Sequence, residues 1–466
     1  MQTKPALRPY QTSVYQQVFA LLAAQHRSII SVCPTGSGKT VMYAAIAQTL
    51  SATGFSVLIL EHREELVAQA SQKIRALGLD HGLVKAGTLE NISSTIVIAS
   101  VQTLVRRITA LAPPDFIIID EAHHALESNS WGKILGAFPN SKRLGFTATP
   151  CRMDGRGLGE TFEKMVCGPE VLELIEAGFL ATYRLFVPKV LLDLASLPVV
   201  RGDYEQSKLA EALGRSSVYS DAVDNYRRRC SGRRAIAFCV NLKHAAEVAA
   251  RFMQEGIAAE VIDGTMGLKE RRELLARFSK GEVFVLVSCS VVSEGTDIPE
   301  AEVALMLRPT KSLALWLQMA GRVLRVTPKK KEAVLLDLVG GTLEHGLICD
   351  RRDWSLEGVK RRKKKGVAGP AVVICESCFS AHRPAPRCPF CSNVNKVQPA
   401  YIDEQKREAL VEAKKEELRR IQAEKKKEVS SAKTMQELRA IEKARCYKPG
   451  WAEHVFRSRQ GRRGVR

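Results

Sequence analysis

The sequence predicts an α/β protein in which two domains, each built on a parallel sheet, follow one another along the chain. In two regions, about 28–149 and 234–340, short apolar segments rich in β-branched residues alternate with segments of helical periodicity. Strands without polar alternation are typical of a parallel sheet that helices cover on both faces. The length of 466 residues agrees with this prediction, because one domain usually holds about 100 to 200 residues.

The first domain is expected over residues 1–185. Between its first two strands, Val41, Ala44, Ala45 and Leu50 fall on one face of a helix. Its strands are predicted at five apolar segments: "SIISV" (28–32), "VLIL" (57–60), "TIVIAS" (95–100), "FIIID" (116–120) and "RLGFTAT" (143–149).

The second domain is expected over residues 216–345, after a less regular connection at 186–215. The same alternation of strands and helices returns there, which predicts a second parallel sheet. Its strands are predicted at "RAIAFCV" (234–240), "AAEVID" (258–263), "VFVLVSC" (283–289), "VALMLRP" (303–309) and "AVLLDLVG" (333–340).

Three smaller parts are expected after the second domain. Residues 346–370 form a basic linker with six consecutive Lys or Arg residues at 360–365. Residues 371–400 form a small cysteine-rich module, and residues 401–466 form a helical, basic tail. Within the tail, "TMQE" (434–437) fits a capping box that begins a helix.

The positive charge is concentrated in this C-terminal part. Residues 351–466 hold 30 Lys and Arg against 14 Asp and Glu, which accounts for +16 of the net charge of +20. A nearly neutral body with a strongly basic tail favours a polyanionic partner, and nucleic acid is the commonest one. A tail that is merely solvated is the alternative.

Two observations bear on the cellular context. The longest apolar runs fall far short of the ~20 residues that a membrane span needs, and the N-terminus lacks the apolar core of a signal peptide. We therefore expect a cytoplasmic protein without a membrane partner. The twelve cysteines are then expected to be reduced and to bind metal or pack in cores.

The stretch "CPTGSGKT" (33–40) lies between a predicted strand and a predicted helix. In this context a glycine-rich turn binds phosphate, because its backbone N–H groups curl round an anion and the helix dipole adds to the field. Lys39 is expected to neutralise the β and γ phosphates of ATP, and the Thr40 hydroxyl to ligate Mg²⁺. The expected cradle comprises Pro34, Thr35, Gly36, Ser37, Gly38, Lys39 and Thr40.

A second stretch, "FIIIDEAHH", supplies the carboxylates that a triphosphate site requires. Asp120 follows a predicted strand of the same sheet and is expected to hold the Mg²⁺ ion. Glu121 is expected to polarise the attacking water. Alone, "DE" after an apolar run is common, but eighty residues after a phosphate loop it predicts a hydrolase site.

With the phosphate loop, "DEAH" resembles the superfamily 2 helicases and translocases, which consist of two RecA-like lobes with ATP in the cleft. "LRPYQ" (7–11) then implies that Gln11 reads the adenine edge. "EHREEL" and "ASVQTL" imply backbone contacts to nucleic acid from Arg63, Gln102 and Thr103. "TATP" implies that Thr147 and Thr149 couple the two activities together with His123. His124 is interpreted as a cap or a surface residue.

Two further motifs in the second lobe follow the same series. "SEGTDIP" (293–299) implies nucleotide contacts from Gly295 and Asp297. "QMAGRVLR" (318–325) implies that the γ phosphate is faced by Gln318, Arg322 and Arg325. One arginine would act as a finger on the charge that develops during transfer, and Arg325 is preferred by its position. Asp263 and Ser288 are expected to grip the nucleic acid.

Within the superfamily, "LRPYQ", "TATPCRMDGRGLG" and a cysteine cluster after the second lobe are most similar to the bacterial RadD (YejH) group and related phage helicases, followed by the XPB-like helicases. The resemblance implies DNA repair, recombination or replication as the setting.

The cysteine-rich module has the spacing C-x₂-C-x₉-C-x₂-C. Two such knuckles offer four thiolates for tetrahedral Zn²⁺, and a site with four protein ligands is structural. His382 is a possible replacement for one cysteine, although full sulfur coordination is simpler. The predicted ligands are Cys375, Cys378, Cys388 and Cys391.

The sequence thus predicts an ATP hydrolase that uses ATP and Mg²⁺ to move along or unwind DNA. An RNA helicase and an ATP-gated nucleic-acid clamp are the alternatives. In the tail, Tyr447, Trp451 and Phe456 are expected either to stack on unpaired bases or to dock the tail onto a lobe. The helical segment 403–445 offers a surface for a protein partner, and a monomer is expected.

Overall fold

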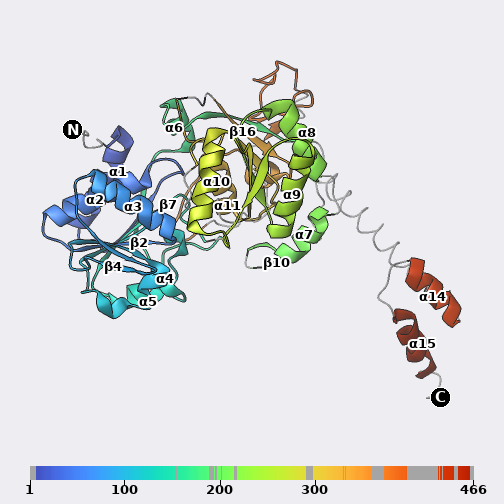
Figure 1. Ribbon diagram of the computed structural model, residues 1–466, viewed down its shortest axis with the longest axis horizontal. Coiled ribbons are helices and arrows are strands. Elements are labelled where there is room, and N and C mark those ends of the chain that lie inside the picture. Colours follow the sequence, from blue (N-terminus) through green and yellow to red (C-terminus); the bar gives the residue numbers. More distant parts are fainter. Residues whose placement is uncertain are drawn as a thin grey trace. The chain divides into compact units, whose positions relative to one another are not determined.

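The structure is a computed structural model with two units, Met1–Asn395 and Lys396–Arg466 (Figure 1). No helix of the described residues is long and apolar enough to cross a membrane. The structure describes residues 7–152, 155–187, 194, 197–200, 202–214, 218–289, 298–328, 330, 332–358, 372–395, 429, 431–432, 434–444 and 450–461.

The first lobe contains an eight-stranded sheet with the order β4-β3-β5-β2-β6-β7-β1-β8. Its strands pair in parallel, except for the antiparallel pair β3 and β4. The five predicted strands are confirmed as β1, β2, β5, β6 and β7. The strands are β1 (Ser28–Val32), β2 (Val57–Glu61), β3 (Gly82–Lys85), β4 (Thr88–Glu90), β5 (Ile96–Ser100), β6 (Phe116–Ile119), β7 (Lys142–Thr147) and β8 (Lys164–Cys167).

Helices cover both faces of this sheet, and each face has its own apolar core (Figure 1). α1, α2 and α3 bury Val14, Met42 and Ile74 on one face, whereas α4 and α5 bury Leu104 and Trp131 on the other. The helices are α1 (Pro9–Ala23), α2 (Lys39–Ala52), α3 (Glu64–Ala76), α4 (Val101–Leu104) and α5 (Ser130–Ala137), with 3₁₀ turns η1 (Ile108–Ala110) and η2 (Ala122–His124).

The second lobe contains a six-stranded, wholly parallel sheet with the order β13-β14-β12-β15-β16-β9. The five predicted strands are confirmed as β12 to β16. The strands are β9 (Thr182–Phe186), β12 (Ala235–Cys239), β13 (Ala259–Ile262), β14 (Val285–Cys289), β15 (Val303–Met306) and β16 (Glu332–Asp337).

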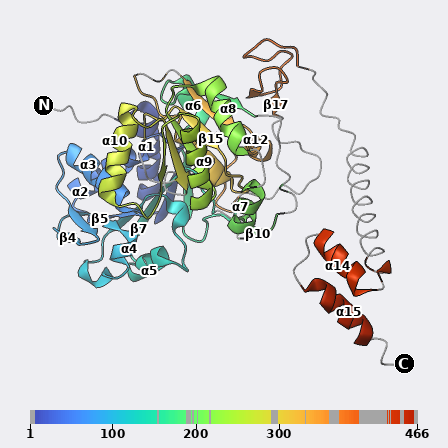
Figure 2. The ribbon, with the colours of Figure 1, turned by 45° about the vertical axis from the view of Figure 1, so that its right-hand side comes forward.

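Helices also cover both faces of the second sheet. On one face, α8 and α9 lie side by side and share a core with α7 (Figure 2). On the other face, α6, α10 and α11 contribute Leu174, Leu274 and Trp316 to one apolar core. The helices are α6 (Val171–Glu176), α7 (Gln206–Gly214), α8 (Val218–Cys230), α9 (Leu242–Gln254), α10 (Leu268–Lys280), α11 (Leu313–Gly321) and α12 (Gly341–His345).

The boundary between the lobes lies earlier than the predicted residue 185. Strand β9 pairs with β16 from Thr182 to Phe186 and forms the edge of the second sheet. Leu174 of α6 packs in the core of the same lobe. Both elements precede the other second-lobe strands by about fifty residues, so the local sequence pattern assigned them to the wrong domain.

The connection predicted at 186–215 packs on the second lobe where the structure describes it. It contains a short antiparallel hairpin of β10 (Val199–Val200) and β11 (Asp203–Tyr204), followed by α7. The Asp203 carboxylate accepts hydrogen bonds from Thr310 Oγ1 at 2.9 Å and from Lys311 N at 2.7 Å. These bonds fix the hairpin beside the start of α11.

Residues 346–358, the described part of the predicted linker, contact both lobes, and we call them the interlobe strap. At one end Leu347 and Ile348 pack in the second-lobe core. At the other end Leu356 packs in the first lobe, and its carbonyl oxygen accepts a hydrogen bond from Gly159 N at 2.9 Å. Gly358 forms an antiparallel bridge with Arg156. This part of the chain is therefore packed structure and not an exposed linker.

The strap leaves no room for a side chain at Gly157, because a Cβ there would lie 1.9 Å from the Leu356 oxygen. We expect Gly157→Val to displace the strap from the first lobe and to lower the free energy of unfolding by about 1 to 3 kcal/mol. Hydrogen exchange should then quicken at residues 155–159 and 346–358. Gly136→Ala is the control, since a Cβ at Gly136 meets nothing within 4 Å. Unchanged protection in Gly157→Val would show that the strap contact is dispensable.

The cysteine-rich module docks on the second lobe. Its two short strands, β17 (Val373–Ile374) and β18 (Ala381–His382), pair antiparallel. Beside them, Val187 N donates to the Phe379 oxygen at 2.9 Å, just after β9 ends. Arg229 of α8 lies over the Phe186 ring and donates to the Cys378 oxygen at 3.1 Å. The module therefore covers part of an edge strand that would otherwise expose unpaired backbone groups.

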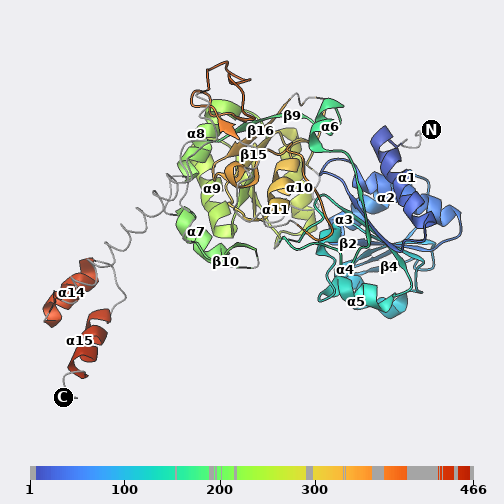
Figure 3. The same cartoon turned by 180° about the vertical axis from the view of Figure 1, so that it is seen from behind.

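In the second unit, α14 (Met435–Ala444) and α15 (Trp451–Gly461) lie side by side (Figure 3). Leu438 and Ile441 form the centre of their small apolar core. The predicted capping box is confirmed, because Glu437 N donates to Thr434 Oγ1 at 3.2 Å and Thr434 N donates to the Glu437 carboxylate at 2.9 Å. Residues 403–428 of the predicted helical segment 403–445 lie outside the described residues.

Candidate nucleotide site and nucleic-acid interface

The loop between β1 and α2 forms the predicted phosphate cradle. Gly36 and Gly38 have φ angles of 87° and 81°, in the left-handed region that favours glycine. A Cβ at Gly38 would lie 2.6 Å from Gln11 Nε2, so a larger residue would also push into the neighbouring helix. Lys39 Nζ donates to the Cys33 oxygen at 3.5 Å, which keeps the ammonium group over the loop.

The start of α1 holds this loop from the side. Gln11 Nε2 and the Tyr10 hydroxyl both donate to the Ser37 oxygen, at 2.9 and 2.7 Å. Gln11 Oε1 accepts a hydrogen bond from Arg8 N at 2.9 Å. Gln11 thus contacts the phosphate loop directly. Its contact with adenine stays a prediction. The buried Ser37 hydroxyl has no hydrogen-bond partner within the described part of the chain.

The two predicted carboxylates lie directly after β6. Burial and the charge of Glu121 raise the pKa of Asp120 to about 7, while Lys39 and Arg322 act in the opposite direction. Glu121 has left-handed backbone angles of 45° and 50°, which are costly for a residue with a side chain. Asp120 Oδ1 accepts the Glu121 N–H at 2.9 Å and helps to hold that conformation. A buried acid next to a cation is suited to binding Mg²⁺.

His123 joins three of the predicted motifs. Its Nδ1 lies 3.0 Å from Thr147 Oγ1 and 3.5 Å from the Glu121 carboxylate. Thr147 Oγ1 in turn accepts a hydrogen bond from Thr149 N at 3.2 Å. On the other side of the ring, Nε2 lies 3.4 Å from Gln318 Nε2 of the second lobe. One imidazole therefore contacts "DEAH", "TATP" and "QMAGRVLR" at once.

Both predicted arginines of the second lobe lie near the phosphate loop. Arg322 is only 6 % exposed, and its charge lowers the pKa of Asp120 across the cleft. A Cβ at Gly36 would lie 3.6 Å from Arg325 Cγ. Burial lowers the pKa of Arg325 to about 10, which leaves its guanidinium charged at neutral pH. Cations from both lobes therefore surround one anion-binding loop.

Sequence reasoning missed one contact between the lobes. Arg271 of α10 forms an ion pair with Glu65 of α3. The same guanidinium donates to the oxygens of Asp263 and Met266, at 3.1 and 3.2 Å. Arg271 belongs to no motif that the sequence singled out, and Glu65 lies in "EHREEL" without a predicted role. The pairing escaped prediction because it joins positions 206 residues apart.

A cavity of about 300 Å³ also lies between the lobes, on the side of the phosphate loop that faces the strap. Pro34 and Thr35 line it from the first lobe, Gly321 and Leu324 from the second, and Trp354 from the strap. The lobes thus meet over a partly hollow interface, which agrees with a cleft that opens and closes.

The first-lobe residues predicted to contact nucleic acid lie just after the carboxyl ends of two neighbouring strands. Arg63 follows β2, and Gln102 and Thr103 follow β5, its parallel neighbour. Gln102 is exposed, and Arg63 and Thr103 are partly exposed. Gln102 Nε2 lies 3.4 Å from His62 Nδ1, and its Oε1 accepts a hydrogen bond from the Ser100 hydroxyl at 2.9 Å. The structure therefore brings these residues together on an accessible edge.

The second-lobe residues predicted to contact nucleic acid, Asp263 and Ser288, lie in different surroundings from those of the first lobe. Asp263 Oδ1 accepts hydrogen bonds from the N–H groups of Thr265 and Met266, at 2.7 and 3.2 Å, and so caps a local turn. Ser288 is 1 % exposed inside β14, so its side chain is not accessible in this arrangement, and its contact with nucleic acid stays a prediction. Its position between two paired strands explains the burial. Gly295 and Asp297 lie outside the described residues.

Two of the three tail aromatics pack within the second unit. Trp451 and Phe456 are partly buried against the core of α14 and α15 and help to hold these helices together. Tyr447 lies outside the described residues. Base stacking and docking on a lobe both stay predictions.

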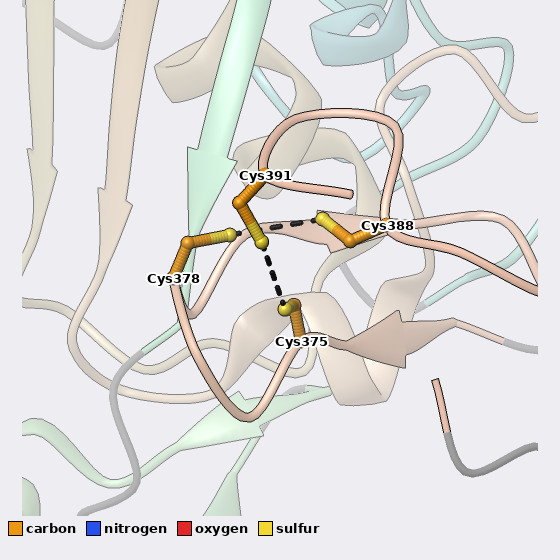
Figure 4. A group of neighbouring side chains, drawn as sticks. All are labelled: Cys375, Cys378, Cys388 and Cys391. Atoms are coloured by element: carbon orange, nitrogen blue, oxygen red, sulfur yellow. Dashed lines mark hydrogen bonds between the residues drawn. The ribbon is translucent and has the colours of Figure 1, made fainter. Parts of the chain in front are cut away.

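The four predicted metal ligands converge in the cysteine-rich module (Figure 4). Cys375 Sγ lies 3.6 Å from Cys391 Sγ, and Cys378 Sγ lies 3.7 Å from Cys388 Sγ. These separations exclude disulfides, whose sulfurs lie ~2.05 Å apart. They fit the edges of a tetrahedron of sulfurs about 2.3 Å from a central Zn²⁺, which are about 3.8 Å long.

Local hydrogen bonds shift the pKa values of these thiols in different directions. Burial alone would raise the pKa of Cys375, but hydrogen bonds with the backbone of Cys378 and Ser377 and with the Cys391 thiol lower it to about 6, whereas the hydrogen bonds with the other thiols raise the pKa of Cys391. The thiolate that a metal requires is thereby favoured at Cys375. His382 is not a ligand here, since its Nδ1 lies 2.6 Å from the Arg383 oxygen and its Nε2 3.4 Å from Asn395 Nδ2.

Known protein families match both lobes. Residues 4–152 match the family described as "Type III restriction enzyme, res subunit", and residues 219–327 match "Helicase conserved C-terminal domain". A "51.5 kDa protein" of Lactococcus phage (isolate 7-9) is 32% identical over 346 residues, which are 74% of this chain and 72% of the phage protein.

Two further likenesses extend over both lobes. The "DNA 3'-5' translocase XPB2" of Sulfurisphaera tokodaii is 28% identical over 75% of this chain and 85% of its own. A fragment of a putative HsdR subunit of a type I restriction enzyme from Vibrio vulnificus YJ016 has the same fold, with a TM-score of 0.59 at 21% identity, over 74% of this chain and 66% of that one. Some relatives are longer, and the chain spans 52% and 57% of two of them.

The likenesses cover the two lobes in which the phosphate loop, "DEAH" and "QMAGRVLR" come together. The chain therefore belongs to the superfamily 2 helicases of the DEAD/DEAH type, and it is similar to the XPB translocases.

Proposed function

We propose that this chain hydrolyses ATP in the cleft between its lobes and uses the cycle to move along DNA. The observation that carries the proposal is the convergence of both lobes on one loop. Arg325 lies beside Gly36, and Gln318 contacts His123 across the cleft. A site assembled from two lobes is complete only when they are closed, so hydrolysis and lobe movement are coupled.

Each residue has a defined task in this scheme. Lys39 neutralises the β and γ phosphates, while Thr40 and Asp120 hold Mg²⁺. Glu121 orients and polarises the attacking water, and its position is fixed by Asp120 and His123. Arg322 and Arg325 stabilise the negative charge that develops on the transferred phosphoryl group. These groups supply positioning and electrostatics, which dominate phosphoryl transfer.

DNA is the proposed track, and RNA is the alternative. The support comes from the printed name of the archaeal relative, a DNA translocase, and from the +16 charge of residues 351–466. Arg63, Gln102 and Thr103 are the proposed contacts to the phosphate backbone. Contacts of this kind position a protein on the nucleic acid without reading its sequence. The resemblance to bacterial RadD and phage helicases further favours a role in DNA repair, recombination or replication, in the cytoplasm of a bacterium or phage-infected cell.

Phosphate release in the presence of matched polynucleotides tests this proposal. Single-stranded DNA, duplex DNA and RNA of equal length are compared at saturating ATP, with a triplex-displacement assay on the DNA that stimulates most. We expect stimulation by DNA together with displacement of the third strand. Stronger stimulation by RNA would support the RNA alternative. Stimulation by DNA without displacement on any substrate would support a clamp that does not move.

The cysteine-rich module is proposed to bind a structural Zn²⁺ ion through Cys375, Cys378, Cys388 and Cys391. Four thiolates leave no position for a substrate, so the ion serves the fold. Since the module contacts β9 and Arg229, its loss is expected to affect the second lobe as well.

We expect Cys388→Ser to reduce bound zinc from about one ion per chain to a small fraction, because one of four ligands is lost. The thermal midpoint of unfolding should fall at the same time. Metal analysis and calorimetry of the full chain measure both effects, with the exposed Cys167→Ser as a control outside the cluster. Wild-type protein that contains no zinc after purification in its presence would overturn the proposal.

A further inference from the structure

A column of stacked rings lies between the nucleotide site and the exposed edge of the first lobe. The rings of His62 and His124 are stacked, with centroids 4.8 Å apart and an angle of 21°. Trp131 continues the column beyond His62, at 6.5 Å and 17°. His124 also contacts His123, with ring centroids 4.2 Å apart. The three histidines come from two different loops, after β2 and after β6.

Two rings of this column contact sites of the proposed function. On the outer side, His62 Nδ1 lies 3.4 Å from the Nε2 atom of the exposed Gln102. At the inner end, His123 contacts Thr147 and the second-lobe residue Gln318. An unbroken series of contacts therefore joins the predicted nucleic-acid edge to the closing surface of the cleft.

The inner histidines share a short turn with a predicted catalytic residue. The 3₁₀ turn Ala122–His124 begins at Glu121, whose backbone is left-handed. His124 N donates to the Glu121 oxygen at 3.0 Å, and the His124 oxygen accepts a hydrogen bond from Asn129 Nδ2 at 2.8 Å. A displacement of the His124 ring is therefore transmitted to the turn that sets the Glu121 carboxylate and the His123 ring.

We propose that His62 and His124 are positioning residues that transmit nucleic-acid binding at Gln102 to His123 and Glu121. The inference rests on the proposed function, in which Gln102 contacts the phosphate backbone. When a phosphate oxygen accepts a hydrogen bond from Gln102 Nε2, the Gln102 amide moves away from His62 Nδ1. Loss of this contact lets the His62 ring shift against His124, and the turn carrying Glu121 follows. The two arrangements of the Gln102 amide provide the two states that such coupling requires.

Phosphate release by the full chain, with and without saturating single-stranded DNA, tests the relay. The variants are His62→Leu, His124→Leu, the double variant and His124→Phe. We expect each leucine variant to keep the DNA-free rate and the DNA affinity but to lose stimulation by about two- to thirtyfold, the range found for coupling residues. The double variant should lose no more than the stronger single variant, because both remove the same path. His124→Phe keeps a ring in the column and should retain stimulation.

His26→Leu is the matched control. His26 precedes β1 and so lies at the amino ends of the strands, whereas the phosphate loop follows their carboxyl ends. Wild-type protein that no polynucleotide stimulates would refute the proposed function itself. Stimulated wild-type protein with equally stimulated leucine variants would overturn the relay alone. Equal losses in the DNA-free and DNA-stimulated rates would assign His124 a structural role, and additive losses in the double variant would show separate paths. Either result contradicts the relay.

Discussion

Lys39→Ala is expected to reduce DNA-stimulated phosphate release by about 100- to 1000-fold, the cost of removing one preorganised charge from a transition state. Lys39 lies over the phosphate loop, and its charge acts on Asp120. Steady-state phosphate release at saturating ATP and DNA measures the effect.

Glu121→Gln should give a loss of similar size by a different route. The amide keeps the shape of the side chain but removes the negative charge that polarises water. ATP binding should therefore persist in Glu121→Gln, while Lys39→Ala also weakens it. Lys142→Ala is the control, since Lys142 begins β7 at the opposite edge of the same sheet. Unchanged turnover in both active-site variants would place the hydrolytic site elsewhere.

Arg325→Ala is expected to have the largest effect of all, about 10³- to 10⁵-fold in turnover, as for an arginine finger. Arg325 lies beside Gly36 and stays charged at neutral pH despite its burial. Nucleotide affinity should change far less than turnover, because the arginine acts mainly on charge that develops during transfer. Single-turnover kinetics with labelled ATP separate the two quantities.

A comparison with Arg322→Ala identifies the finger. Arg322 acts on Asp120, so its loss is expected to weaken Mg²⁺-nucleotide binding as well as turnover. Arg251→Ala controls for loss of a second-lobe arginine, since Arg251 pairs only with Glu255 on the surface of α9 among the contacts described. If both cleft arginines could be removed with less than a tenfold loss, the second lobe would not contribute to catalysis.

The parts of the fold that the sequence predicted are those with local signatures. The continuous apolar runs at β1, β6 and β14 are required because parallel strands are buried on both faces. The phosphate loop was predictable because left-handed backbone at Gly36 and Gly38 requires glycine. The four cysteines were predictable because a metal site fixes ligand type and spacing.

The parts that escaped prediction depend on contacts between distant segments. Strand β9 has an ordinary strand pattern, and only its pairing with β16 assigns it to the second lobe. The interlobe strap carries no sequence motif. Its contact with the first lobe depends on the space that Gly157 leaves, which a local sequence pattern does not reveal. Ser288 was expected to grip the nucleic acid, whereas its strand pairs on both sides and its side chain is buried.

The central claim is that one triphosphate is held by both lobes at once. A structure of the full chain with single-stranded DNA and a non-hydrolysable ATP analogue tests it most directly. We predict that the terminal phosphate lies within hydrogen-bond distance of Lys39 Nζ and of at least one guanidinium from Arg322 or Arg325. A nucleotide contacted by the first lobe alone, with DNA bound, would contradict the account.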